Sequence, residues 1–164
     1  MPTPERLVRR LRDADAAAVV ELVQTCWSEY EGCVYDEDEM RHLRRPASHY
    51  AALGGDAWVA VHGERLLGSV ACRPGAAPDV LELQLLYVWP QARRRGVASM
   101  LVGRVEGEAR RRRAKRVELW SDSRFSAAHR MYEALGYRRQ PGARHLDDVS
   151  ASVEWPFRKE LVGH

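Results

Sequence analysis

The sequence is poor in the features that mark secreted, membrane-bound and metal-stabilised proteins. Its three cysteines, Cys26, Cys33 and Cys72, are odd in number and form no C-x-x-C pair, which argues against a disulfide framework and against a zinc site. No apolar run approaches the roughly 18 residues of a membrane-spanning helix, and the N-terminal residues are charged where a signal peptide is hydrophobic. We therefore expect a cytoplasmic protein with no bound metal and no membrane contact.

Lysine is also scarce, and the overall charge gives little sign of a polyanionic partner. The formal net charge is +3 on 164 residues, and Lys115 and Lys159 are the only lysines. The run Arg110–Arg113 is basic enough to suggest nucleic acid. However, it falls at the C-terminal end of an expected helix, where cations are favoured, and no aromatic residues interleave it. We interpret it as a solvated helix end and expect no nucleic-acid partner.

The hydrophobic pattern predicts one α/β (α+β) domain over residues 1–164. Strand and helix patterns alternate through the middle of the chain, with hairpins at both ends, which indicates a mixed sheet with helices on both faces. Pro46 is expected to end the second helix. The expected strands are 6–11, 58–61, 66–71, 81–88, 117–120, 137–139 and 152–159, and the expected helices are 16–30, 36–45, 97–109 and 126–135, with a further helical turn over 50–53.

One strand carries a break in its alternation. Apolar and polar residues alternate from Leu81 to Leu85, but Leu85 and Leu86 are both apolar, so the phase slips by one residue. A slip of this kind is typical of a β-bulge. The pattern therefore predicts a bulged strand in the centre of the chain.

The loop after this strand is built to bind an anion. An apolar strand enters it and a helix leaves it, so backbone N–H groups and the positive helix end meet there. Gly96 allows close backbone approach, small Ala98 keeps the helix start uncrowded, and Arg93, Arg94 and Arg95 offer charge-assisted hydrogen bonds. The alternative is a solvated arginine-rich loop with an ordinary glycine.

Two motifs in this order resemble the GNAT family of N-acetyltransferases. Arg93-x-x-Gly96-x-Ala98 is similar to the family's R/Q-x-x-G-x-G/A loop, and Leu86-Tyr87-Val88-x-Pro90 precedes it. The later segment from Ala128 through Tyr132 to Tyr137 is similar to the family's A-x-x-x-Y-x-x-x-G-[FY] pattern. The resemblance implies a GNAT-like fold with a mixed, mostly antiparallel twisted sheet and a bulged central strand.

The resemblance also implies acetyl-CoA as co-substrate, with its pyrophosphate in the glycine loop and its pantetheine arm where the bulged strand splays from its neighbour. Many family members have an asparagine seven residues before the motif tyrosine, and here that position is Phe125, so Ser123, Ser126 or backbone groups would have to replace it. The cofactor contacts implied by the resemblance are Leu86, Tyr87, Val88, Arg93, Arg94, Arg95, Gly96, Val97, Ala98, Ser99 and Ser126.

Two residues are candidates for proton transfer. Tyr132 matches the family's tyrosine near the thioester sulfur and is implied to protonate the coenzyme A thiolate; the alternative is a core aromatic residue. Glu82 lies where many members place a carboxylate that accepts the amine proton through water, and it is equally well explained as a solvent-facing acid. Glu118 is a weaker candidate for the same role. His129, one turn before Tyr132, is interpreted as a surface histidine.

The acceptor side gives the least information. In the family the first two helices and the last loop shape the acceptor pocket, which here means Trp27, Tyr30, Tyr35 and Asp36, within an acidic run to Glu39, opposed by residues 144–149. An acidic, aromatic lining suits a small cationic amine; the acids are equally consistent with a helix N-terminus.

These features predict a direct N-acetyltransferase that acts on a primary amine, more readily a small molecule than a protein. The alternatives are a non-catalytic acyl-CoA-binding module and an enzyme that acetylates a protein lysine or N-terminus. A homodimer stays open, with the 152–159 segment as a pairing edge.

Overall fold

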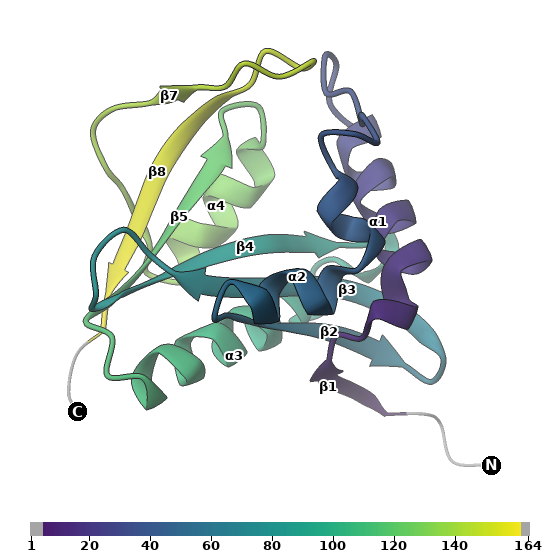
Figure 1. Ribbon diagram of the computed structural model, residues 1–164, viewed down its shortest axis with the longest axis horizontal. Coiled ribbons are helices and arrows are strands. Elements are labelled where there is room, and N and C mark those ends of the chain that lie inside the picture. The colour runs from purple at the N-terminus through teal and green to yellow at the C-terminus, as the bar shows by residue number, and fades with distance from the viewer. Residues whose placement is uncertain (1–4, 162–164) are drawn as a thin grey trace.

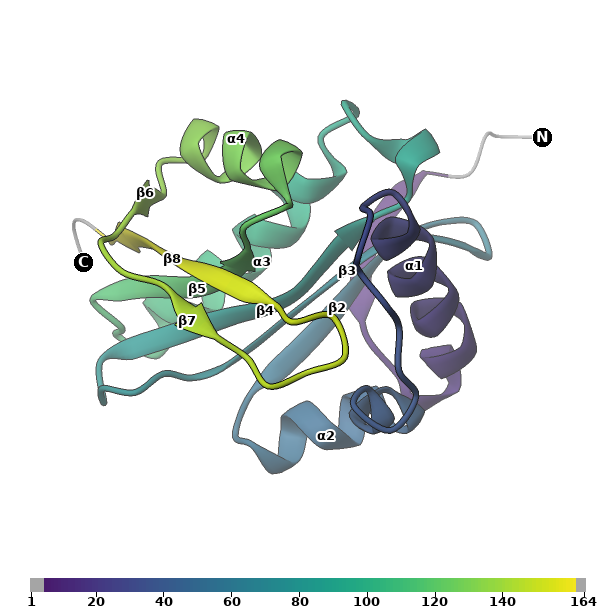
Figure 2. The same ribbon diagram turned by 90° about the horizontal axis from the view of Figure 1, so that it is seen from above.

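A twisted sheet separates two pairs of helices in the computed structural model, which describes residues 5–161 (Figures 1 and 2). α1 and α2 cover one face, and α3 and α4 cover the other (Figure 2). The strands are β1 (Arg6–Arg10), β2 (Asp56–His62), β3 (Arg65–Pro74), β4 (Val80–Val88), β5 (Arg116–Asp122), β6 (Arg138–Arg139), β7 (Arg144–His145) and β8 (Val153–Glu160). The helices are α1 (Ala16–Ser28), α2 (Pro46–Ala52), α3 (Val97–Arg111) and α4 (Ser126–Ala134), and the 3₁₀ turns are η1 (Asp13–Asp15), η2 (Arg41–Arg44) and η3 (Pro90–Ala92).

The sheet is mixed and mostly antiparallel, as expected from the sequence. Its strand order is β1-β2-β3-β4-β5-β8-β6, and β7 also pairs with β8. Only β4 and β5 run parallel; the other pairs are antiparallel. The expected mixed, mostly antiparallel sheet with helices on both faces is therefore confirmed.

The predicted bulge lies at Leu85. Between β3 and β4 the pairs Ser69–Tyr87 and Ala71–Gln84 leave one more residue on β4 than on β3. Leu85 has a φ of 57°, which a leucine rarely adopts, and its carbonyl oxygen accepts a buried hydrogen bond of 2.8 Å from Ser69 Oγ. The hydroxyl of Ser69 thus satisfies a backbone acceptor at the bulge.

β4 separates from β5 after Glu82, just before the bulge. The two strands pair only over Val80–Glu82 and Arg116–Glu118 among the described residues. From there β5 and β8 tilt away from β4 in Figure 1, and α4 lies against the opened side. The sheet is therefore split between β4 and β5, and α4 packs beside the gap.

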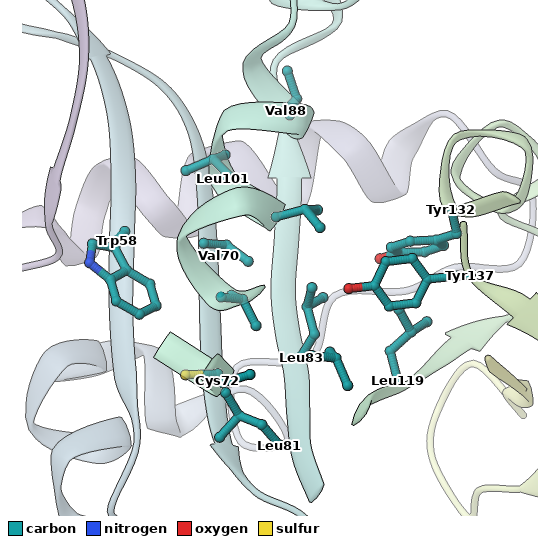
Figure 3. Close-up of a cluster of buried hydrophobic side chains, with 14 of the residues drawn as sticks. Trp58, Val70, Cys72, Leu81, Leu83, Val88, Leu101, Leu119, Tyr132 and Tyr137 are labelled. Carbon is teal, nitrogen blue, oxygen red and sulfur yellow. The ribbon is translucent and has the colours of Figure 1, made fainter. Parts of the chain in front are cut away.

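Each face of the sheet has its own hydrophobic cluster. Leu81, Leu83 and Val88 of β4 join α3, β5 and Tyr132 on one face, as Figure 3 shows. Leu85 and Tyr87 pack with α1 and α2 on the other. Because the bulge adds a residue, Tyr87 rather than Leu86 lies on the α1–α2 face.

Two expectations about local structure are wrong. Residues 36–45 form turns and a short 3₁₀ segment rather than a helix, because the Asp36 carboxylate accepts the Glu39 N–H (3.0 Å) and short-range turn bonds follow. Pro46 begins α2 instead of ending a helix, a position where its missing N–H costs nothing.

The C-terminal strand is not a free edge. β8 pairs with β5 on one side and with β6 and β7 on the other, and Gln140 N–H donates to the Pro156 carbonyl between them (2.8 Å). The expectation that residues 152–159 offer an edge for dimer pairing is therefore wrong, since the backbone groups on both sides of β8 are already occupied.

The arginine run at the end of α3 contacts this chain's own groups. Arg111 and Arg112 pair with Glu108, and Arg112 also donates to the Gly54 carbonyl (2.7 Å) and Asp56 (3.1 Å). These contacts agree with a helix end stabilised by its own carboxylates. Within residues 5–161, no helix combines the length and the apolar character needed to cross a bilayer.

Replacing Ser69 with alanine should destabilise the fold at the bulge. Ser69→Ala leaves the buried Leu85 carbonyl without its donor, so we expect the free energy of unfolding in urea to fall by about 1–3 kcal/mol. Ser28→Ala, which removes an exposed hydroxyl from α1, serves as the control with a change below about 0.5 kcal/mol. Equal losses in the two variants would contradict a special role for the Ser69 bond.

Candidate active site

A cavity of about 460 Å³ lies between the end of β4, the loop that follows it and α4. Its walls combine residues near the end of α1, the segment from the end of β4 to the start of α3, and α4, three parts of the chain that are distant in the sequence. Its basic lining residues are Arg93, Arg94 and Arg130, and no acidic residue lines it among those described. The full lining is Cys26, Tyr30, Leu86, Tyr87, Val88, Ala92, Arg93, Arg94, Gly96, Val97, Ala98, Ser99, Phe125, Ala127, Ala128, Arg130, Met131, Ala134 and Leu135.

The loop at this cavity has the geometry of an anion site. Arg94 and Gly96 both have positive φ, 61° and 78°, which curls the chain tightly before α3. α3 begins at Val97, its first turn has free N–H groups by helix geometry, and no side chain in the described chain caps it. A Cβ built on Gly96 meets no atom within 4 Å, so the space in front of this turn is open to a ligand. These features fit a pyrophosphate.

The three arginines of the loop differ in their roles. Arg93 forms an ion pair with Glu29 at the end of α1 (2.5 Å), which ties the loop to that helix and raises the pKa of the guanidinium. Arg95 lies outside the cavity lining, and its carbonyl accepts a bond from Arg6 (2.8 Å). Arg94 lines the cavity with no ion-pair partner among the described residues. Arg94 is thus the best-placed loop side chain for a phosphate, and Arg93 acts as an anchor.

The helix α4 supplies the cavity wall opposite the loop. Most of its lining residues were not predicted from the sequence. Ala127, Ala128 and Met131 line the cavity at helical spacing. Phe125, where a family asparagine would stand, also lines it and packs on Tyr30 with ring centroids 4.9 Å apart. Ser126 begins α4 but is not a lining residue. The wall is therefore apolar where the family pattern would place an amide.

A second cavity of about 320 Å³ adjoins the first and has the opposite charge. Tyr87 and Phe125 line both cavities. Four carboxylates and no basic residue line the second one among the residues described. Its full lining is Trp27, Cys33, Glu39, Met40, Tyr87, Asp122, Phe125, Leu146, Asp148, Ser150, Ser152 and Glu154.

Two of these carboxylates are neutralised locally and two are not. Asp122 pairs with Arg124 (2.8 Å) and Glu154 with Arg144 (2.7 Å). The hydrogen bonds from Arg124 outweigh burial and lower the pKa of Asp122. Glu39 instead accepts the Val149 N–H (3.0 Å), and Asp148 accepts the Ser152 N–H (2.8 Å).

The same contacts join two loops over the second cavity. Besides the bond between Glu39 and Val149, Ser150 Oγ accepts from Val34 N–H (2.8 Å) and donates to the Val34 carbonyl (3.2 Å). Figures 1 and 2 both show the segment after α1 close to the loop between β7 and β8. Hydrogen bonds to backbone groups thus join the two loops that line the second cavity, and they leave Glu39 and Asp148 without an ion-pair partner among the described residues.

Tyr132 lies on α4 in the hydrophobic cluster of the α3–α4 face, and it is not among the lining residues of either cavity. It is 6% exposed, and its ring packs edge-on against Tyr137 at 5.9 Å (Figure 3). Its hydroxyl has no hydrogen-bond partner among the described residues, yet no fully buried side-chain polar atom there lacks one. The hydroxyl therefore keeps contact with open space, and burial raises its pKa, so the phenol holds its proton.

Glu82 and Glu118 face each other across the last β4–β5 pair. Glu118 is engaged by Arg116 (2.7 Å), whereas Glu82 accepts a hydrogen bond from the Gln84 amide (2.6 Å). Alternation with Leu81 and Leu83 places Glu82 on the α1–α2 face of β4. Glu82 is therefore the carboxylate of the pair that forms no ion pair among the described residues, although Arg73 lies opposite it across β3–β4 and it lines neither cavity.

The predicted acceptor residues divide between the cavities. Trp27 lines the second and Tyr30 lines the first. Tyr35 packs on Trp27 with ring centroids 5.7 Å apart, and Asp36 caps the Glu39 N–H; neither is among the lining residues. The run 36–39 contributes Glu39, and the segment 144–149 contributes Leu146 and Asp148.

The other candidate reactive side chains, His129 and Cys26, are buried in packed or hydrogen-bonded environments. His129 is buried rather than at the surface: its Nε2 lies 3.1 Å from Ser121 Oγ and 3.0 Å from the Asp122 carbonyl, and its ring stacks on Trp155 and Phe157. Cys26 lines the first cavity, but burial raises the pKa of its thiol, which disfavours a nucleophilic thiolate.

Comparison with known proteins is consistent with this geometry. A family model described as the acetyltransferase (GNAT) family matches residues 16–137. N-acetylaspartate synthetase of Rattus norvegicus is 33% identical over 107 residues, which cover 65% of this chain and 33% of that protein. The chain spans about a third of the length of the curated relatives it matches.

Solved structures show the same fold at low identity. A GNAT-family acetyltransferase from Staphylococcus aureus matches with a TM-score of 0.82 and 14% identity over 96% of this chain and 100% of that chain. A chain from Salmonella typhimurium, solved with acetyl-CoA, matches with a TM-score of 0.72 and 19% identity over 97% of this chain and 95% of that chain.

Closing the space in front of Gly96 should abolish ligand binding at the loop. Acetyl-CoA at 100 times its Kd should stabilise the unaltered protein by about 2.7 kcal/mol, measured as a thermal shift. In Gly96→Val the added side chain occupies that space, and we expect the acetyl-CoA-induced shift to disappear.

The control is Gly103→Ala, an exposed glycine within α3 whose added Cβ also meets no atom within 4 Å. It should gain about 0.5–1 kcal/mol of stability from helix propensity and keep the full ligand shift. A full shift in Gly96→Val would show that the anion binds elsewhere.

Proposed function

The chain belongs to the GNAT acetyltransferase family, and we propose that it transfers the acetyl group of acetyl-CoA directly to a primary amine of a small cationic molecule. Members of this family use acetyl-CoA as their co-substrate, and the first cavity has the open turn and positive charge that suit its phosphates. The proposed contacts are those of the loop and of β4, with Arg94 rather than Arg93 as the principal cationic side chain.

The observation that supports this proposal is the pair of adjoining cavities with opposite charge. The basic cavity suits the anionic end of coenzyme A, and the acidic one suits an amine. Because Tyr87 and Phe125 line both, the acetyl group and the amine would meet there. The joined loops over the second cavity favour a small molecule over a protein segment.

The curated relatives support an amine acceptor but not the same amine. They are named for N-acetylaspartate synthesis. Aspartate carries two carboxylates, and the second cavity presents carboxylates with no basic side chain among its described lining residues. Like charges would repel in that space, so we assign a cationic acceptor.

Attack on the thioester requires an uncharged amine. An alkylammonium has a pKa of about 10, so one proton must leave before the nitrogen bonds to the carbonyl carbon. We assign this proton to Glu82, through water, because Glu82 shares the Tyr87 face of β4 and forms no ion pair among the described residues. The carboxylate then carries that proton while the amide forms.

The departing thiolate needs a proton in the last step. As the carbon–sulfur bond breaks, its electron pair stays on sulfur, and the Tyr132 hydroxyl supplies the proton. Burial keeps this phenol protonated at neutral pH, and its hydroxyl has no competing partner among the described residues. The second proton of the attacking nitrogen leaves as the amide forms and returns through solvent to the Tyr132 oxygen, and Glu82 releases the first proton to solvent. The net reaction converts ammonium and thioester into amide, free thiol and one proton.

Removing the two uncompensated charges should weaken acceptor binding. With acetyl-CoA fixed, thiol release is measured for 1,4-diaminobutane, tyramine and aspartate. Glu39→Gln and Asp148→Asn each keep a hydrogen-bond acceptor for the loop N–H but lose the charge, so we expect the KM of the cationic amines to rise about fivefold, or ~1 kcal/mol, with little change in kcat.

Glu64→Gln, an exposed carboxylate in the β2–β3 turn, is the matched charge control and should leave KM unchanged. A preference for aspartate would overturn the cationic assignment. Acetyl-CoA binding without thiol release across a broader set of amines would favour the non-catalytic binding module.

Tyr132→Phe should lower kcat about 100-fold, because it removes the proton donor and keeps the ring packing. The measurement is steady-state thiol release with saturating acetyl-CoA. Tyr137→Phe is the comparison: its hydroxyl donates to Glu106 (3.0 Å), so its loss should reduce stability while kcat stays within about threefold. A near-normal rate in Tyr132→Phe would remove that residue from the mechanism.

A further inference from the structure

The wall between the two cavities has one polar side chain. Of its two shared residues, Phe125 offers only a ring, whereas Tyr87 carries a hydroxyl. We propose that the Tyr87 hydroxyl donates a hydrogen bond to the carbonyl oxygen of the bound acetyl thioester and stabilises the negative charge that develops there. This inference rests on the proposed function, which brings the acetyl group to that wall.

The orientation of the hydroxyl is set by Trp27. The indole Nε1 of Trp27 donates to the Tyr87 oxygen at 3.0 Å. An indole N–H cannot accept a hydrogen bond, so the phenolic proton of Tyr87 must point elsewhere. The hydroxyl donates no hydrogen bond to any of residues 5–161, which leaves this proton for a ligand at the wall.

The bulge determines which side chain reaches this place. In a regular strand Leu86 would share a face with Glu82 and Gln84. The additional residue at Leu85 puts Tyr87 on that face instead, against α1. Tyr35 packs on Trp27 from the far side, at 5.7 Å between ring centroids, so the donor of this bond is itself fixed by packing.

The chemistry suits a donor rather than a base. Burial raises the pKa of Tyr87, so the hydroxyl stays protonated at neutral pH. A hydroxyl that accepts a hydrogen bond from an N–H becomes a stronger donor, because the two bonds polarise each other. A fixed donor aimed at an oxygen that gains charge stabilises the transition state more than the ground state. Trp27 is accordingly a positioning residue that acts through Tyr87.

Tyr87 and Tyr132 would then act on different atoms. Tyr132 supplies a proton to sulfur when the bond breaks, and Tyr87 keeps its proton and holds the carbonyl oxygen when the amine attacks. This separation gives each tyrosine its own measurable signature.

The test is isotope-edited infrared spectroscopy of [1-¹³C]acetyl-CoA bound to the full chain, which needs no acceptor. A hydrogen bond to a carbonyl lowers its stretching frequency. We expect the carbonyl band to move to higher wavenumber in Tyr87→Phe, to move partway in Trp27→Phe, and to stay in place in Tyr132→Phe. In the Tyr87→Phe background, Trp27→Phe should add no further shift.

An unchanged band in Tyr87→Phe, with acetyl-CoA bound, would overturn the inference while leaving the proposed function intact. If Tyr87→Phe fails to fold, Trp27→Phe decides, since it keeps the phenol and an unmoved band there would equally refute the pair. Failure of the unaltered protein to bind acetyl-CoA in calorimetry would overturn the proposed function and this inference together. With an accepted amine, Tyr87→Phe should also lower kcat about 100-fold, with the KM for acetyl-CoA little changed.

Discussion

The hydrogen bond from Ser69 Oγ to the Leu85 carbonyl stabilises the feature on which the rest of the site depends. It satisfies a backbone acceptor where Leu85 adopts an unfavourable φ and the register of β3 and β4 shifts. One consequence follows directly from the bulge: the side chain of Tyr87 lies on the α1 face, which Leu86 would occupy in a regular strand. The bulge lies between the last β4–β5 pair at Glu82 and the anion loop that follows β4.

The two cavities beside the split strands carry side chains of opposite charge. Arg94 and Arg130 face the first cavity, while Glu39 and Asp148 face the second. Ion pairs compensate the charge of Arg93 at the first cavity and of Asp122 at the second. The pair of Arg93 with Glu29 also ties the loop to the end of α1, whereas the pair of Arg124 with Asp122 is local to the end of β5. Electrostatic complementarity and mechanical support therefore come from the same contacts.

The sequence predicted the parts of the site that are local in the chain. The phase slip at Leu85–Leu86 predicted the bulge, and the glycine with its preceding arginines predicted the anion turn. It could not predict contacts that depend on distant loops. The acids of 36–39 fit an acceptor lining and a helix start equally well in the sequence. In the structure no helix begins there, and Glu39 lines a cavity with its carboxylate bound to the Val149 N–H, 110 residues later. Similarly, Phe125 gains its place from Tyr30 in another element.

Tyr87 illustrates what a motif match alone leaves undetermined. The resemblance placed it among the cofactor contacts, as part of a strand whose backbone lines the first cavity. A motif in a strand fixes the backbone path, but the face of each side chain depends on the register, and a bulge inverts it. Because that inversion directs the phenol to Trp27 rather than into the sheet's other core, the residue that lines the cofactor cavity also borders the acceptor. In the proposed mechanism, the bulge therefore brings the hydroxyl that polarises the thioester carbonyl of acetyl-CoA to the side from which the amine attacks.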